Sequence, residues 1–220
     1  MTKAIHHLFL LIAAGLFVLS NQASAQSGIT IDASQQITSF QFTSSTGQDD
    51  DTYSPIYSGA YTVGYTHFLD HGIYLDGGLG MRNAGATMTL DDTHLRWDFR
   101  YAQVELGGGY LYDLGMFSPY LGVAGYYARL LKANQRINDP TRENINYDLM
   151  EAGMVNEADL GLLITPGVRI EASDYVSVYT EFEYLWGLQN IEAGESSQEA
   201  SNLGYSLSIG LSITIDNQSE

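Results

Sequence analysis

The stretch Leu203–Ile215 reads LGYSLSIGLSITI, and its residue types alternate strictly. Every odd position is leucine, tyrosine or isoleucine, and every even position is glycine, serine or threonine. A period of two is the period of a β-strand, whose successive side chains point to opposite faces. The stretch therefore predicts a strand with one strongly apolar face.

The same alternation recurs along the chain. It predicts eight strands, at residues 36–46, 55–69, 72–86, 95–112, 119–133, 158–171, 175–188 and 203–215. The first of these alternates weakly. The fifth contains LGVAGYYARL, which is apolar on both parities, so its alternation leaves open which residues share a face.

The connections between these strands also alternate in length. Short turns follow the second, fourth and sixth strands, at residues 70–72, 115–118 and 173–174. Longer polar connections follow the others and contain GQDDD, TLDDTH, the segment 134–156 and EAGESSQEA. Tight turns at one end and long loops at the other are typical of bacterial outer-membrane barrels. We therefore predict an all-β fold, an eight-stranded antiparallel up-and-down transmembrane β-barrel.

A soluble eight-stranded barrel is the alternative, because alternation does not say whether the apolar face points inward or outward. The less apolar faces are rich in small residues, which suit a narrow lumen better than a water-facing surface. The strands are also long enough for a tilted crossing, which needs about 9–11 residues. Aromatic residues lie at both predicted rims, as membrane interfaces favour: Trp97 and Trp186 at the long-loop end, and Tyr110, Tyr112, Phe117 and Tyr120 near a short turn.

The first residues of the chain have the pattern of a secretory signal peptide. A short basic start, MTKAIHH, is followed by the apolar LFLLIAAGLFVL and by the small-residue site ASA. We expect residues 1–25 to be this signal and residues 26–220 to form the barrel domain in the cell outer membrane. The chain has no cysteine, so no disulfide is expected.

The chain is strongly acidic, with a formal net charge of −17. Loss of Lys3 with the signal leaves Lys132 as the only lysine, which argues against a nucleic-acid partner. The acidic tracts Asp49–Asp51 and Asp91–Asp92 are expected to be solvated loop tips. Alternatively, divalent cations bridge them to lipopolysaccharide phosphates.

Charged residues within the strands are expected to face the lumen. In Val178–Leu188, VYTEFEYLWGL, the even positions would face lipid and the odd positions, including Glu181 and Glu183, would face inward. A charge facing lipid costs about 2–4 kcal/mol near the midplane for a basic residue, which favours this parity. The same parity places Glu171 inside. The predicted polar network of the lumen consists of Asp76, Arg82, Glu105, Arg169, Glu181 and Glu183.

Two further expectations concern particular positions. The fourth strand needs a bulge near Tyr101 if Trp97, Phe99 and Tyr101 are to face lipid together with Val104. Arg82 lies on the third strand and is expected to form an ion pair across the lumen with Glu181 or Glu183 of the seventh strand, which would plug the barrel.

Residues for catalysis or for binding a metal or cofactor are scarce. His67 and His71 flank the first turn without a third ligand nearby, and His94 has no evident catalytic partner. The Gly-x-Gly runs are not followed by a helix that could bind a phosphate. We therefore expect no catalytic, cofactor or metal site and no enzyme activity.

Three segments carry a resemblance to a known family. They resemble the PorT-like outer-membrane β-barrel family of Bacteroidota and read PYLGVAGYYARLL, DLGLLITPGVRIE and EFEYLWGLQNI. The third ends, as in that family, on a Gly-Leu-x-Asn-Ile motif, here Gly187, Leu188, Gln189, Asn190 and Ile191. The resemblance covers the mature chain in layout and is specific from Tyr101 to Ile191. The chain departs from the family in its first strand and in its DNQSE end. The resemblance implies an eight-stranded barrel and no shared activity.

Together these patterns predict a small monomeric outer-membrane barrel with a side-chain-filled lumen. Its expected role is structural or a surface interaction through its extracellular loops. The expected partners are outer-membrane lipid and lipopolysaccharide, with other cell-envelope proteins as further candidates. The alternative function is a channel or transporter for ions or small apolar molecules.

Overall fold

The computed structural model describes residues 27–44, 53–140, 144–194 and 198–215. The predicted signal peptide and the tract Asp49–Asp51 lie outside the described residues. Among the described residues, no helix is long and apolar enough to cross a bilayer. The strands are β1 Ser27–Ser44, β2 Ser54–Phe68, β3 Ile73–Leu90, β4 Thr93–Leu111, β5 Phe117–Asn138, β6 Ile145–Asp148, β7 Ala158–Glu171, β8 Val176–Gly187 and β9 Gln198–Ile215.

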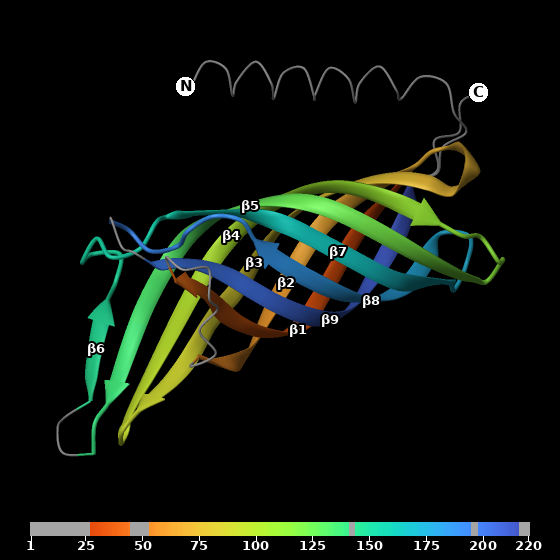
Figure 1. Ribbon diagram of the computed structural model, residues 1–220. Helices are drawn as coiled ribbons and strands as arrows, with labels where there is room; N and C mark the ends of the chain where they lie inside the picture. The colour runs from red at the N-terminus through yellow and green to blue at the C-terminus, as the bar shows by residue number, and fades with distance from the viewer. Residues whose placement is uncertain (1–26, 45–52, 141–143, 195–197, 216–220) are drawn as a thin grey trace, which may run out of the picture.

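Eight of these strands close into a ring in which every neighbouring pair is antiparallel (Figure 1). Each ring strand pairs with the next along the chain, β5 pairs with β7, and β1 pairs with β9 over its whole length. The short strand β6 pairs with the far end of β5 and stands outside the ring. The predicted eight-stranded up-and-down antiparallel barrel is therefore confirmed.

The β2–β3, β4–β5 and β7–β8 connections lie at one end of the barrel, together with Ser27 and Ile215, which pair with each other. One of them is the 3-10 turn Asp70–Gly72, in which His71 (φ 66°) and Gly72 (φ 83°) are left-handed. Glycine adopts this conformation without steric cost, so it suits a turn this tight. We call this end the short-turn end and the opposite one the long-loop end.

The outward face of the barrel is apolar, as a lipid-facing surface must be. Ile209 and Leu207 are each 64% exposed, and Trp186 is exposed at the long-loop end. Tyr110, Tyr112 and Phe117 are exposed around a short turn, as predicted. Tyr120 was wrongly placed in this belt, because its side chain points into the lumen and contacts Glu181.

Several strands are longer than predicted. Strand β1 begins at Ser27 instead of residue 36, because Ile29 and Ile31 face outward and the backbone pairs with both β2 and β9. The predicted long loop containing Asp91–Asp92 is wrong. Strands β3 and β4 pair up to Leu90 and Thr93, so only a two-residue turn remains, with Asp91 at φ 52°. This hairpin projects at the long-loop end (Figure 1).

The prediction that Trp97, Phe99 and Tyr101 of β4 face lipid is also wrong. Phe99 and Tyr101 are buried inside the barrel, and Trp97 is half-buried there, so β4 keeps one parity and needs no bulge. A register shift does occur beside Tyr101, but the extra residue is Leu131 of β5. The sequence left open which residues of β5 face inward. In the structure its even positions face inward from Ser118 to Leu130, up to this shift.

Inward tyrosines fit the narrow lumen because they lie over glycines. A Cβ added at Gly210 would approach the Tyr179 ring to 2.3 Å, and one at Gly167 would approach the Tyr120 ring equally closely. No side chain other than hydrogen leaves room for these rings. The glycines on the less apolar face of the strands thus allow large side chains to fill the interior.

Candidate functional site

A layer of buried side chains crosses the lumen between its two ends. Its members come from five strands and are each at most 2% exposed: Arg82, Tyr101, Tyr126, Asp159 and Asn202. We call this group the closing layer. Arg82 Nη2 donates to Asp159 Oδ2 in a buried ion pair.

The other members of the closing layer hold this ion pair in place. Tyr126 Oη and Asn202 Nδ2 both donate to Asp159 Oδ2, at 3.1 and 2.9 Å. The Arg82 guanidinium lies over the rings of Tyr101 and Tyr126, at 4.5 and 5.0 Å from their centroids. A buried ion pair is stable only when further contacts of this kind compensate its lost hydration.

The predicted ion pair between Arg82 and Glu181 or Glu183 is therefore wrong. Strands β3 and β8 do lie opposite each other in the ring, but Arg82 reaches Asp159 on β7. Barrel strands are tilted and staggered, so equal counts from a turn do not give equal depth across the lumen.

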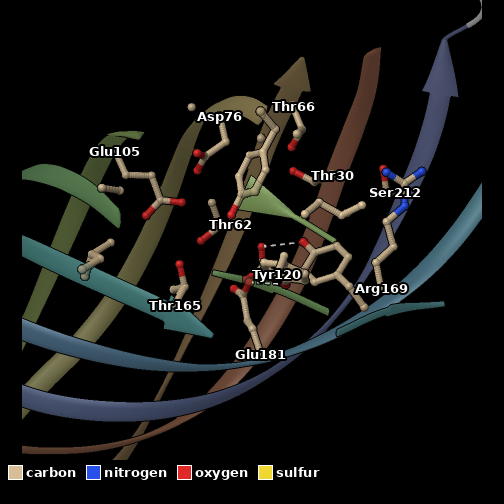
Figure 2. Close-up of a pocket in the computed structure, with 18 of the residues that line it drawn as sticks. Thr30, Thr62, Thr66, Asp76, Glu105, Tyr120, Thr165, Arg169, Glu181 and Ser212 are labelled. Atoms are coloured by element: carbon tan, nitrogen blue, oxygen red, sulfur yellow. Dashed lines mark hydrogen bonds between the residues drawn. The ribbon is translucent and has the colours of Figure 1, made fainter. Parts of the chain in front are cut away.

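On the short-turn side of the closing layer lies a hollow of about 110 Å³. Figure 2 shows the carboxylates of Asp76, Glu105 and Glu181 pointing into this space. We call it the acidic chamber, and the carboxylates that line it are Asp32, Asp76, Glu105, Glu181 and Glu183. With Arg169, which also lines it, the chamber brings together five of the six predicted lumen residues. It adds Asp32, which the sequence did not indicate because β1 was expected to begin later.

Most of these carboxylates are held by neutral donors. Tyr120 Oη donates to Glu181 at 2.7 Å, and Tyr179 Oη donates to Asp32 at 3.2 Å. Gln103 Nε2 donates to Glu105 at 3.0 Å, and Ser206 Oγ donates to Glu183 at 3.5 Å.

Among the described residues, no ion pair involves a carboxylate of the acidic chamber. The salt bridges between described residues are Arg82–Asp159, Arg96–Asp98, Arg129–Glu157 and Arg136–Asp98. The lumen network is thus divided between the closing layer and the chamber.

Arg169 lies at the short-turn mouth of the acidic chamber. Its Nε donates to Ser177 Oγ at 2.9 Å, and its guanidinium lies 4.7 Å from the centroid of the Phe68 ring. Glu171, predicted to face the lumen, is exposed where β7 ends.

On the long-loop side of the closing layer the interior is apolar. Phe40 packs against Phe99 with ring centroids 5.2 Å apart, and Phe42 stacks on Tyr53 at 4.0 Å. Trp97 lies against Tyr53 and not at the lipid interface, so its predicted place in the aromatic belt is wrong. Together with Leu149, Val155 and Ile191, these side chains line a hollow of about 370 Å³, which we call the apolar cup.

The connection between β5 and β7, predicted as a polar loop, forms one side of the apolar cup. Leu149 is buried and its amide donates to Ala133 O. The Asn156 side chain donates to the carbonyls of Asn190 and Glu192, both at 2.9 Å. The connection is thereby fixed to the segment that follows β8.

The residues that carry the family resemblance shape this same region. Asn190 Oδ1 accepts hydrogen bonds from the amides of Glu192 and Ala200, and Ile191 is buried in the apolar cup. A Cβ at Gly187 would lie 2.7 Å from Asn202 O, so glycine permits the close approach of β8 and β9.

No group of three or more His, Cys, Asp or Glu side chains among the described residues could hold a metal ion. His67 Nδ1 forms a hydrogen bond with Ser27 Oγ at 2.8 Å, and His94 Nδ1 forms one with Thr89 Oγ1 at 3.0 Å.

The fold is similar to that of small eight-stranded outer-membrane β-barrels. Neisserial surface protein A aligns with a TM-score of 0.52 at 13% sequence identity, over 87% of this chain and 99% of that one. OprG from Pseudomonas aeruginosa aligns with a TM-score of 0.55 at 12% identity, over 86% of this chain and 96% of that one. No protein-family model and no curated protein sequence matches the chain.

Proposed function

We propose that the protein is a monomeric, non-enzymatic barrel of the outer membrane that acts through its long-loop end. In this role it is a structural or surface-interaction protein. The closing layer carries the proposal: its side chains cross the lumen and are each at most 2% exposed, so we expect no continuous path for water. The apolar outward face supports placement in lipid. Outer-membrane lipid and lipopolysaccharide are the proposed partners, and a second protein of the cell envelope would bind at the long loops.

The proposed membership of the PorT-like family rests on the three segments PYLGVAGYYARLL, DLGLLITPGVRIE and EFEYLWGLQNI, the last of which runs into the motif at residues 187–191. The part that Asn190 and Ile191 play in fixing the apolar cup supports it, since it gives a structural reason for that motif.

A planar lipid bilayer tests the closed lumen. We expect the wild-type barrel to give no steady conductance, because the closing layer leaves no water path. The double variant Arg82→Ala/Asp159→Ala, which removes both charges of the layer, should conduct. Steady conductance by the folded wild-type protein would show that it is a channel for ions, and the proposed function would then be wrong.

A carrier for small apolar molecules is the second candidate function, and the apolar cup favours it. Five aromatic side chains are among those that line that hollow, and aromatic residues are common in sites for apolar ligands. Transfer of an apolar dye into lipid vesicles distinguishes the two functions, since only a carrier would accelerate it.

A further inference from the structure

The acidic chamber has an excess of negative charge that the described residues do not balance. Five carboxylates line it, and the guanidinium that lines it with them is Arg169 at its mouth. Arg82, which reaches the inner end, is already paired with Asp159. Uncompensated charges away from bulk water are costly, so the chamber favours a positively charged occupant.

The carboxylates are spread along the chamber and do not converge on one point. They come from four strands, and each hydrogen-bonded one is turned toward a different donor. Even the two neighbours on β8, Glu181 and Glu183, have backbone positions about 7 Å apart along the strand. Among the described residues no three of them form a metal-binding group. A ligand that fits this pattern carries several positive charges separated along its length.

Two buried amide oxygens at the inner end of the chamber point to the same chemistry. Gln36 is 4% exposed, and its Oε1 has no hydrogen-bond partner among the described residues. Gln103 Oε1 is also buried and has no hydrogen-bond partner among the described residues. Both side chains line a smaller hollow that adjoins the acidic chamber and shares Glu105, Glu181 and Glu183 with it. A buried acceptor without a donor is costly, and an ammonium group supplies three donors and no acceptor.

The chamber is also lined by aromatic side chains. Tyr74, Tyr120 and Tyr179 line it, and the Arg169 guanidinium already lies over the Phe68 ring at its mouth. Cations attached to carbon chains bind well against such rings, and methylenes between the charges lie against apolar wall.

We propose that the acidic chamber binds a linear aliphatic polyamine, a methylene chain with two or more ammonium groups, which enters from the short-turn end. The ammonium groups pair with Glu181, Glu183 and Glu105, and the innermost one donates to Gln36 Oε1. This site goes beyond the proposed function, because it lies on the other side of the closing layer from the long-loop mouth.

Isothermal titration calorimetry with spermidine, a linear triamine, on the folded full-length protein in a zwitterionic detergent at low salt tests this proposal. We expect the wild type to bind spermidine, and Glu181→Gln/Glu183→Gln to bind it at least about tenfold more weakly. The control Glu151→Gln/Glu199→Gln removes two carboxylates from exposed positions at the long-loop end. It should change the affinity less than about twofold.

Further measurements control for folding and for the number of charges on the ligand. Circular dichroism must show that each variant is folded, which we expect because glutamine keeps the shape of glutamate. Butylamine, with one ammonium group, should bind more weakly than spermidine. The proposal is overturned if spermidine does not bind, if the two double variants weaken binding equally, or if Mg²⁺ binds more tightly than spermidine. None of these results depends on whether the barrel conducts.

Discussion

Replacing Arg82 with alanine should lower the free energy of unfolding by about 3–5 kcal/mol, because it leaves Asp159 charged, buried and unpaired. Asp159 is 0% exposed, and its remaining partners Tyr126 and Asn202 are neutral donors. Urea unfolding of the barrel in detergent, followed by circular dichroism, measures the loss.

Matched variants distinguish the effect of breaking the ion pair from the effect of shortening the Arg82 side chain. Arg82→Met/Asp159→Leu should lose much less stability than Arg82→Ala, because no buried charge is left without a partner. Arg129→Ala breaks the exposed Arg129–Glu157 pair, whose side chains are 67% and 59% exposed, and should cost less than about 1 kcal/mol. A double-mutant cycle should give strong coupling of Arg82 to Asp159 and weaker coupling to Glu183. The opposite order would contradict the closing layer.

Replacing Ile209 with arginine should destabilise the barrel in lipid by about 2–4 kcal/mol. Ile209 is 64% exposed on the outward face, near the middle of the part of β9 that would cross the bilayer. A guanidinium there would lie in hydrocarbon. Equilibrium unfolding from lipid vesicles measures the effect.

Two controls accompany the Ile209 variant. Ile209→Ala removes side-chain volume without adding charge and should cost clearly less. Thr180→Arg on β8, which is exposed on the same outward face and directly paired with Ile209, should behave like Ile209→Arg. An arginine at Ile209 that leaves stability in lipid unchanged would mean that this face contacts water, and a soluble barrel would then be the better description.

Alternation was enough to predict the ring because the period of two is a local property of each strand. The bounds of β7 agree with the predicted 158–171, and Glu181 faces inward as parity required. Strand β4 was misjudged because Phe99 and Tyr101 are apolar and yet buried inside the barrel. Composition does not tell an aromatic residue in lipid from one in an apolar lumen.

The candidate site was harder to predict than the ring. Asp159 shares its parity with Gly161 and Arg169, so continuing the alternation of β7 to its first residues would have placed it inward. Its pairing with Arg82 could not be predicted in the same way, because strand tilt and stagger determine which residues lie at one depth. The apolar cup depends on contacts between Asn156 and Asn190, which are distant in sequence and belong to no strand.

Side-specific labelling of introduced cysteines tests the closed lumen most directly, since the chain has no cysteine of its own. Thr62→Cys would place a thiol in the acidic chamber, Leu114→Cys at the short-turn end and Gln135→Cys in the apolar cup. Each variant is inserted into lipid vesicles in a single orientation, which labelling of the Leu114 and Gln135 variants establishes. A small, charged, membrane-impermeant thiol reagent is then added to one side.

With the closing layer intact, we expect Thr62→Cys to be labelled only from the side that labels Leu114→Cys. In the background Arg82→Ala/Asp159→Ala it should be labelled from both sides. Labelling of Thr62→Cys from the side that labels Gln135→Cys, with Arg82 and Asp159 in place, would contradict a lumen closed by this ion pair.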